Sequence, residues 1–323
     1  EMCIRDSYIC NDCPRRCGAR RTDEKGSGVC MSPALPRVAR AAPHFGEEPC
    51  ISGTRGSGAI FFTGCNLRCV FCQNRDISRT RLGTPLTEEA LAHRLLALAD
   101  SGVHNINLVT PTHYTEPLAR VLEKVKPRLH IPVVWNSGGY ERPATLRRLD
   151  GLVDIYLPDF KYASPALAGA LSGAPDYPET AEAALAEMYR QVGGVQFTED
   201  ATLLRRGVLV RHLVLPGCRR DSCAVLGRIA RLLPVRDIRV SVMSQYTPDF
   251  LDPGFALPET FQAELERQGI RPALRRRLTD FEYRSVLDEA DRLGITGYRQ
   301  GRASAQALYT PDFKEGIVQE EQP

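Results

Sequence analysis

The stretch Gly64-Cys65-Asn66-Leu67-Arg68-Cys69-Val70-Phe71-Cys72 places three cysteines on one short segment, directly after an apolar run at 58–63. The spacing Cys-x3-Cys-x2-Cys puts three soft thiolates on a tight loop, which suits an iron–sulfur cluster. The next cysteine is Cys218, far along the chain. Three protein ligands would leave one iron with an open position, and a vacancy is what distinguishes a reactive metal site from a structural one. A structural zinc loop is the alternative, but zinc knuckles favour paired Cys-x2-Cys units with four ligands.

Around this loop the sequence alternates between short apolar runs and amphipathic stretches. We expect six strands, at 58–63, 104–109, 131–135, 153–157, 207–214 and 238–243. Helices are expected between them, at about 87–102, 115–126, 143–149, 178–191 and 221–233. Strict alternation predicts an α/β fold with a parallel sheet and right-handed crossovers. Six units are too few for a closed eight-fold TIM barrel, so we predict a partial (β/α)6 barrel with its site at the strand C-termini.

Three segments are expected along the chain: a Cys-rich N-terminal segment at 1–50, a core at 51–250 and a C-terminal helical extension at 251–323. Residues 1–7 fit neither the hydrophobic periodicity nor the chemistry of the sequence that follows. We expect them not to be part of the native protein. Residues 8–50 show no clear helical or strand period and predict a loop-rich segment held by a metal. After a Pro-rich linker, Thr279 and Glu282 form a capping box that opens a helix to about Leu293, and this tail is expected to cover an open edge of the barrel.

Composition excludes several classes of protein. A hydrophobic content of 43% and a charged content of 25% are typical of a globular chain of 323 residues and exclude a disordered one. The net charge of +3 provides no specific signal for nucleic acid. No run reaches the roughly 18 apolar residues of a membrane helix, and the start lacks the pattern of a secretory signal. We therefore expect a cytoplasmic protein, in which clustered cysteines indicate metal binding or catalysis.

A second group of cysteines lies near the start, at Cys10, Cys13, Cys17 and Cys30. Four thiolates close a tetrahedral site, and both zinc and an auxiliary 4Fe-4S cluster satisfy that arrangement. A cluster at these cysteines would transfer electrons, or a metal there would hold the segment in its folded conformation. Nearby arginines would offset the negative charge of the thiolates. The remaining cysteines receive no predicted role: Cys3, Cys50, Cys218 and Cys223.

The pattern Cys-x3-Cys-x-aromatic-Cys, with Phe71 at the aromatic position, resembles the signature of the radical S-adenosylmethionine (SAM) superfamily. Over about residues 8–310 the sequence is similar to proteins described as pyruvate formate-lyase activating enzyme-like. The matching segments are Gly46-Glu47-Glu48-Pro49, Ile51-Ser52-Gly53-Thr54-Arg55-Gly56, Cys72-Gln73-Asn74, Asn105-Ile106-Asn107-Leu108-Val109-Thr110-Pro111-Thr112-His113-Tyr114, Asp154-Ile155-Tyr156-Leu157-Pro158-Asp159-Phe160-Lys161, Arg211-His212-Leu213-Val214-Leu215-Pro216-Gly217 and Met243-Ser244-Gln245-Tyr246.

This resemblance implies an oxidoreductase that uses a 4Fe-4S cluster on Cys65, Cys69 and Cys72. The open iron would bind the amino and carboxylate groups of SAM, and one electron from the reduced cluster would break the S–C5′ bond. The resulting 5′-deoxyadenosyl radical would abstract a hydrogen atom, in activating enzymes from a glycine of a glycyl radical enzyme. A flavodoxin- or ferredoxin-type protein would supply the electron.

Polar side chains at the ends of the expected strands are candidates for the SAM pocket, since ligands bind at the C-terminal ends of parallel strands. They are Thr110, Thr112, Asn136, Ser137, Asp159, Lys161, Arg211 and Gln245. The resemblance assigns Asn136, Ser137, Asp159, Lys161 and Arg211 to the methionine part, the ribose or an associated cation, and Phe71 to the adenine. Lys161 and Arg211 suit the SAM carboxylate. Simple activating enzymes carry Gly-Gly-Glu after the second strand to hold the SAM amino group, and Thr110-Pro111-Thr112 stands there instead.

Two alternatives remain beside the activating enzyme. The same radical chemistry would serve an enzyme that acts on a small molecule or on RNA. A non-catalytic iron–sulfur or zinc electron-transfer protein is the other class, and the three-cysteine loop argues against it because an electron carrier gains nothing from an open iron.

Overall fold

The computed structural model describes residues 8–256, 258–267, 269–301 and 313. Its fold is α/β, built around a mostly parallel central sheet with the strand order β12-β11-β10-β8-β7-β6-β4-β3-β5. The parallel part consists of β4 (Ser57–Phe62), β6 (Ile106–Val109), β7 (Val133–Ser137), β8 (Ile155–Pro158), β10 (Leu204–Leu213), β11 (Arg239–Met243) and β12 (Gly297–Arg299). The structure has a strand at each of the six expected positions, and β12 adds a further parallel strand beside β11.

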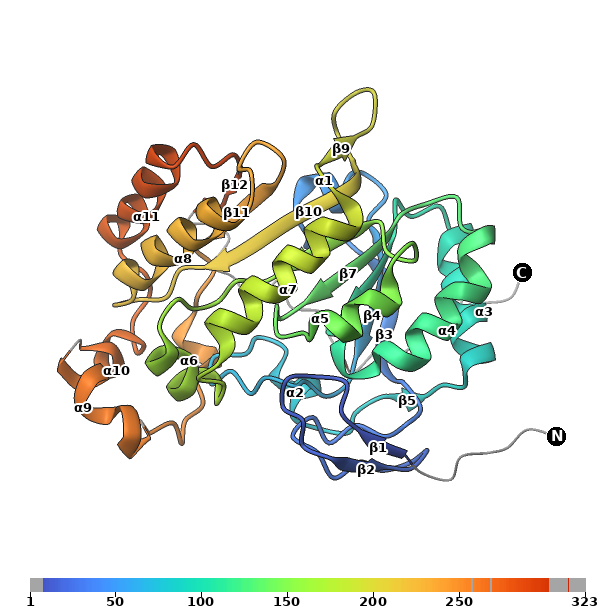
Figure 1. Ribbon diagram of the computed structural model, residues 1–323, viewed down its shortest axis with the longest axis horizontal. Coiled ribbons are helices and arrows are strands. Elements are labelled where there is room, and N and C mark those ends of the chain that lie inside the picture. The colour runs from blue at the N-terminus through green and yellow to red at the C-terminus, as the bar shows by residue number, and fades with distance from the viewer. Residues whose placement is uncertain (1–7, 257, 268, 302–312, 314–323) are drawn as a thin grey trace.

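Residues 8–50 contain three strands that the sequence analysis did not predict in this loop-rich segment. β3 (Arg37–His44) pairs antiparallel with β4, and β5 (Thr84–Pro85) pairs antiparallel with β3. The pairing of β3 shifts register between Val38 and Arg40, so its buried positions do not alternate, and the period that predicts a strand is lost. β1 (Tyr8–Cys10) and β2 (Ala19–Arg21) form a separate antiparallel pair below the sheet in Figure 1. A short strand, β9 (Gln196–Phe197), pairs antiparallel with β10.

The helices that connect the parallel strands agree with the expected ranges. In Figure 1 they lie along the outside of the sheet, as in a partial barrel, and they are α3 (Glu88–Asp100), α4 (Thr115–Val125), α5 (Pro143–Leu146), α7 (Tyr177–Val192) and α8 (Arg219–Leu232). Thr87 caps α3, because its hydroxyl accepts a hydrogen bond from the Ala90 N–H at 3.2 Å. Single 3-10 turns complete the connections: η1 (Thr112–Tyr114), η2 (Lys126–Arg128), η3 (Arg147–Leu149) and η4 (Pro248–Phe250).

Three helices in the core were not predicted: α1 (Pro49–Ser52), α2 (Arg75–Ser78) and α6 (Pro165–Ser172). The longest of them, α6, reads Pro-Ala-Leu-Ala-Gly-Ala-Leu-Ser and is buried at all positions after Pro165. A helix that is apolar on all sides has no amphipathic period to detect. Its ends do carry signals, since Ser164 accepts a hydrogen bond from Leu167 N–H and Gly173 adopts the left-handed conformation.

The C-terminal part of the chain closes one edge of the sheet. The expected linker after residue 250 contains two helices, α9 (Glu259–Arg267) and α10 (Ile270–Ala273), so that prediction was wrong for this stretch. Their buried Leu265 and Ile270 join the core, which outweighs the prolines nearby. The expected helix is α11 (Asp280–Arg292), and it packs against α8 while β12 extends the sheet.

The interior is one main hydrophobic cluster that includes the fully buried Trp135 and Leu108 of the sheet together with Leu118 of α4. Among the described residues, no helix combines the length and the apolar character that a membrane crossing would need.

Glu282 ties the C-terminal extension to the barrel and generates a prediction about acid stability. Its carboxylate accepts hydrogen bonds from Gly217 N–H at 2.7 Å, from Thr279 N–H at 3.0 Å and from Arg276 at 2.7 Å. Burial would raise the pKa of Glu282, but these hydrogen bonds outweigh it and lower the pKa to about 2. A carboxyl whose pKa is depressed stabilises the fold above its unfolded pKa of 4.5, and the contribution is lost as the pH falls toward 2.

We therefore expect Glu282→Gln to lower the free energy of unfolding by about 1–3 kcal/mol at pH 7. The difference in the free energy of unfolding between wild type and variant should become smaller as the pH falls from 5 to 3, as measured by urea unfolding. Asp288→Ala, on the exposed side of the same helix, is the control and should behave like wild type at both pH values. A gap that stays constant with pH would contradict the role assigned to the Glu282 carboxylate.

Candidate functional site

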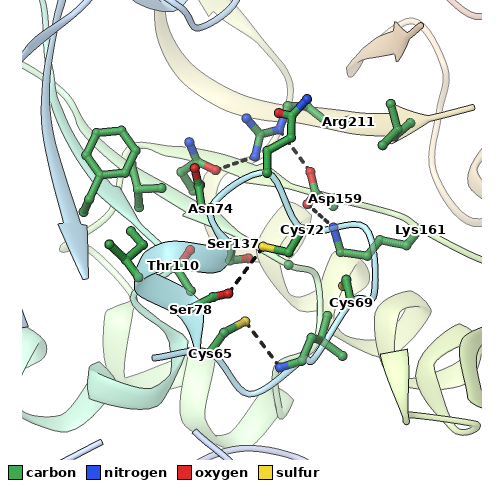
Figure 2. A pocket seen from close by; sticks show the side chains of 18 of the residues that line it. Cys65, Cys69, Cys72, Asn74, Ser78, Thr110, Ser137, Asp159, Lys161 and Arg211 are labelled. Carbon is green, nitrogen blue, oxygen red and sulfur yellow. Dashed lines mark hydrogen bonds and ion pairs between the residues drawn. The ribbon is translucent and has the colours of Figure 1, made fainter. Parts of the chain in front are cut away.

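One cavity of about 220 Å³ lies at the C-terminal ends of the parallel strands. Figure 2 shows the three cysteines of the 65–72 loop together with the charged side chains of Asp159, Lys161 and Arg211. Most of the residues predicted from the sequence line this cavity: Cys65, Phe71, Cys69, Cys72, Thr110, Asn136, Ser137, Asp159, Lys161, Arg211 and Gln245. These predicted residues are up to 180 positions apart in the chain, from Cys65 to Gln245.

Thr112 is the predicted pocket residue that the structure places outside the cavity. It is buried on η1, and its hydroxyl donates a hydrogen bond to Glu141 Oε1 at 2.5 Å. Burial raises the pKa of Glu141 to about 7, so this carboxyl titrates near neutral pH behind the cavity wall. The hydroxyl of Thr112 is therefore committed to an internal partner rather than to a ligand.

The cysteine loop is held by hydrogen bonds to each sulfur. The Leu67 N–H donates to Cys65 Sγ at 3.3 Å, the Ser172 hydroxyl donates to Cys69 Sγ at 3.0 Å, and the Ser78 hydroxyl lies 3.5 Å from Cys72 Sγ. Burial raises the pKa of Cys65, and the neighbouring Cys69 raises it further. A thiol with a raised pKa becomes a ligand when a metal displaces its proton, so metal binding here would release protons.

The donor set of this loop fits an iron–sulfur cluster. All three sulfurs belong to residues that line one cavity, and three thiolates on one loop are the chemistry that such clusters require. Within the described ranges, no three His, Cys, Asp or Glu side chains form a group that could hold a single metal ion. A cubane 4Fe-4S cluster does not need three ligands that converge on one ion, because each thiolate binds its own iron atom.

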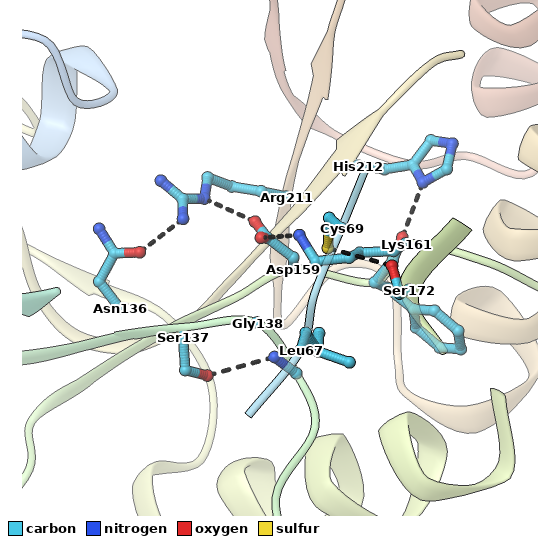
Figure 3. Close-up of polar contacts among 12 residues, drawn as sticks. Leu67, Cys69, Asn136, Ser137, Gly138, Asp159, Lys161, Ser172, Arg211 and His212 are labelled. Atoms are coloured by element: carbon cyan, nitrogen blue, oxygen red, sulfur yellow. Dashed lines mark hydrogen bonds and ion pairs between the residues drawn. The ribbon is translucent and has the colours of Figure 1, made fainter. Parts of the chain in front are cut away.

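A network of partly buried charges also lines the cavity, and Figure 3 shows it from close by. Asp159 accepts from Arg211 Nε at 3.1 Å through one oxygen and from Lys161 Nζ at 2.5 Å through the other. Burial would raise the pKa of Asp159, but Lys161 and Arg211 outweigh it and lower the pKa. Asp159 therefore stays ionised and fixes both cations at the cavity surface.

Arg211 has further partners, which limits how it can bind a ligand. Its Nη1 donates to Glu47 Oε2 at 3.1 Å, and its Nη2 donates to Asn136 Oδ1. Lys161, by contrast, uses one of its three N–H donors on Asp159 and lies near enough to Cys69 for their charges to interact. Lys161 is therefore better placed than Arg211 to receive a carboxylate next to the cysteine loop.

Glu47 is a cavity residue that the sequence analysis did not single out. Its Oε1 accepts from Asn107 at 3.0 Å and from Asn136 at 2.9 Å, while its Oε2 accepts from Arg211. One carboxylate thus orients side chains from β6, β7 and β10. Glu47 lies within the quoted segment Gly46-Glu47-Glu48-Pro49, and its charge next to a strand end was the available signal.

Two backbone positions shape the wall beneath the cysteine loop. Thr110 lines the cavity with a φ of 58°, which is a strained conformation for a β-branched residue. Gly139 has a φ of 72°, and a Cβ there would lie 2.0 Å from the carbonyl oxygen of Asp159. Gly139 is thus required by backbone packing, whereas Gly138 lines the cavity itself.

Phe71 and Gln245 border the cavity near β11. The Phe71 ring contacts Tyr246 edge-on, with ring centroids 6.1 Å apart, and is buried. The backbone carbonyl of Gln245 accepts from the Gln73 side chain at 3.3 Å. These contacts join the cysteine loop to the end of β11, and they leave an aromatic face and an amide on the cavity surface.

The four N-terminal cysteines line a second, much smaller cavity together with Asn66 of the cysteine loop. Cys10, Cys13 and Cys30 are buried and Cys17 is exposed. The buried guanidinium of Arg21 lies 3.2 Å from Cys30 Sγ, so a cation accompanies the thiols. The four predicted ligands share this cavity, but within the described residues no three of them form a group that could hold a single ion such as zinc, whereas each thiolate of a 4Fe-4S cluster binds its own iron.

The comparisons with known proteins agree with this geometry. Residues 59–207 match the family model described as the radical SAM superfamily. An uncharacterised protein of Methanocaldococcus jannaschii is 27% identical over 296 residues, which cover 88% of this chain and 75% of that protein.

Two solved structures are also similar to parts of the chain. The Streptococcus suis protein SuiB bound to the precursor peptide SuiA is 13% identical, with a TM-score of 0.47 over 74% of this chain. The match covers 47% of SuiB, so this chain spans about half the length of that protein. Methylornithine synthase is 17% identical, with a TM-score of 0.43 over 79% of this chain and 72% of the synthase.

The matched segment runs from β4 through the start of β10 and includes the cysteine loop, Asp159 and Lys161. The part of the chain that carries Cys65, Cys69 and Cys72 is therefore similar to the radical SAM superfamily.

Proposed function

We propose that this protein reductively cleaves SAM and uses the 5′-deoxyadenosyl radical to abstract a hydrogen atom from the glycine of a glycyl radical enzyme. The observation that supports the proposal best is that the cysteine loop and the Asp159–Lys161–Arg211 charge network face the same cavity. When bound, a reduced 4Fe-4S cluster supplies one electron to the sulfonium, which separates into methionine and the 5′-deoxyadenosyl radical.

Different residues of the chain would bind the cluster and SAM. Cys65, Cys69 and Cys72 would hold three irons, and Lys161 would receive the SAM carboxylate through its remaining N–H donors. Arg211 is held by Glu47, Asp159 and Asn136 and would position this wall rather than bind directly. Phe71 offers an apolar surface for the adenine, and Ser137 and Gln245 offer polar groups for the ribose or the amino group.

The choice of a glycyl radical enzyme rests on the similarity of the quoted segments to activating enzyme-like proteins. A flavodoxin- or ferredoxin-type protein would supply the electron. If the abstracted hydrogen instead belongs to a small molecule or to RNA, the cavity and its ligands would serve unchanged.

We also propose that Cys10, Cys13, Cys17 and Cys30 hold a second metal, either zinc or a 4Fe-4S cluster. The support is their shared cavity and the burial of three of them beside Arg21. Burial raises the pKa of Cys13 to about 11, so this thiol loses its proton when a metal replaces it.

Replacement of Cys69 by Ala should abolish formation of 5′-deoxyadenosine, because the loop then lacks one of its three thiolates. The assay uses protein reconstituted anaerobically with iron and sulfide, reduced and mixed with SAM. Cys223→Ala, a half-buried cysteine on α8, is the control and should retain the activity. Wild type that keeps its cluster and forms no product would contradict the proposal. Adding a candidate glycyl radical enzyme should give a glycyl radical by electron paramagnetic resonance with wild type and none with the Cys69 variant.

Replacement of Lys161 by Met should weaken SAM binding about tenfold or more, because a charge-assisted hydrogen bond is lost. Asp159 keeps Arg211 as a partner, so the fold should remain, as thermal unfolding would show. Binding is measured by equilibrium dialysis of the reconstituted proteins, with Lys124→Ala on the exposed face of α4 as the control. An unchanged SAM affinity would remove Lys161 from the proposed site.

The metal content of the full chain should distinguish the N-terminal alternatives. A variant with Cys13→Ala and Cys17→Ala should lose about four irons per chain if the site holds a 4Fe-4S cluster, or about one zinc if it holds zinc. Metal analysis and iron spectroscopy provide the measurement. A variant with unchanged iron and zinc would show that these cysteines bind neither.

A further inference from the structure

Ser172 makes the shortest hydrogen bond to any sulfur of the cysteine loop among the described residues. It is the last residue of α6, it is fully buried, and its hydroxyl lies 3.0 Å from Cys69 Sγ (Figure 3). The hydrogen bonds to Cys65 and Cys72 are longer, at 3.3 and 3.5 Å. Hydrogen bonds to ligand sulfurs are among the factors that set the reduction potential of an iron–sulfur cluster.

The Tyr162 hydroxyl contacts the Ser172 hydroxyl, and the two hydrogen bonds of Ser172 can each be given a direction. The Tyr162 hydroxyl lies 2.7 Å from Ser172 Oγ, and either atom could be the donor in that pair. A cysteine that binds iron is a thiolate and can only accept, so the Ser172 hydrogen must point at Cys69. Tyr162 must then donate to Ser172, and since burial raises the pKa of Tyr162, it keeps the proton that this requires. The chain Tyr162–Ser172–Cys69 therefore polarises toward the sulfur.

Arg15 fixes Ser172 from the other side, and it comes from the N-terminal cysteine segment. Its Nη2 donates to the Ser172 carbonyl at 2.9 Å, its Nη1 donates to the Gly173 carbonyl, and its Nε donates to the Asn66 carbonyl at 2.8 Å. The guanidinium also lies 5.3 Å from the centre of the Tyr140 ring. One planar side chain thus spans the end of α6 and the cysteine loop, which a lysine could not reproduce.

Arg15 lies between Cys13 and Cys17 in the chain, and it lines the N-terminal cavity together with all four cysteines. Two further contacts join the same segments. Arg68 donates to the Val29 carbonyl at 3.2 Å, and Gly64 approaches the Cys30 backbone so closely that a Cβ would lie 2.6 Å from its carbonyl oxygen. The N-terminal site and the cysteine loop are therefore in direct contact.

We propose that Ser172 is a positioning residue that raises the reduction potential of the cluster on Cys65, Cys69 and Cys72, and that Arg15 makes this potential depend on the N-terminal metal site. The inference rests on the proposed function, because it requires both metal groups. A hydrogen bond to a ligand sulfur stabilises the reduced cluster, which carries one more negative charge than the oxidised form. The positive charge of Arg15 acts in the same direction.

Ser172→Ala should lower the potential of this cluster. We expect about a tenfold loss in the ratio of reduced to oxidised cluster at a given solution potential, which is about 59 mV for one electron. The measurement is a redox titration followed by electron paramagnetic resonance in protein whose N-terminal cysteines are intact. Ser172→Thr keeps a hydroxyl and should restore most of the potential, and Tyr162→Phe should lower it by less than Ser172→Ala.

A purely structural role for Ser172 is tested by Ser164→Ala. Ser164 caps the N-terminal end of α6, whereas Ser172 lies at its C-terminal end, so this variant weakens the helix without removing the donor to Cys69. The inference predicts an unchanged potential for Ser164→Ala. Equal shifts in Ser164→Ala and Ser172→Ala, or no shift in Ser172→Ala, would overturn it. Wild type without a reducible cluster would instead refute the proposed function.

The coupling through Arg15 calls for a double-mutant cycle. Arg15→Ala should lower the potential, and so should a Cys13→Ala, Cys17→Ala variant that has lost the N-terminal metal. If Arg15 transmits the effect, the combined variant should show a shift no larger than the greater of the two. Arg16→Asn is the control, because Arg16 has a φ of 42° and asparagine tolerates that conformation. Fully additive shifts would overturn the coupling.

Discussion

The partly buried guanidinium of Arg211 makes the set of hydrogen bonds on which the cavity depends. It joins Glu47, which follows β3, to Asn136 of β7 and to Asp159 beyond β8, while Arg211 itself belongs to β10. A charge that is largely removed from water is costly without partners, and the oxygens around Arg211 offset that cost. The strands and loops that supply these groups are therefore held in one arrangement, and the walls of the cavity are organised before a ligand enters.

The charges of this network come close to balancing. Glu47, Glu48 and Asp159 face Arg211 and Lys161, so three carboxyl groups accompany two cations. Burial raises the pKa of Glu48, although the nearby Arg211 opposes the shift. Lys161 and Arg211 each have a carboxylate partner at the cavity wall, so neither cation is left unpaired there.

The parallel strands and the cavity residues were predictable for physical reasons that can be named. Strands such as β4 are buried on both faces and leave a continuous apolar run in the sequence. Their C-terminal ends meet at one edge, so polar residues there, such as Asp159 and Asn136, were expected together. The register shift of β3 and the uniformly apolar α6 leave no period to detect. Glu47 and Ser172 act through partners such as Arg211 and Cys69, which lie 164 and 103 positions away, and such contacts have no local signature.

The close approach at Gly64 has a consequence for how the protein is assembled. A Cβ at this position would lie 2.3 Å from Ser32 Oγ and 2.6 Å from the carbonyl oxygen of Cys30, so the two segments share a volume that admits no side chain. The position of the loop that carries Cys65 is therefore tied to that of the segment that carries Cys30. Any side chain at position 64 would push these two cysteine-bearing segments apart, so the absence of a side chain at Gly64 sets how closely they can pack.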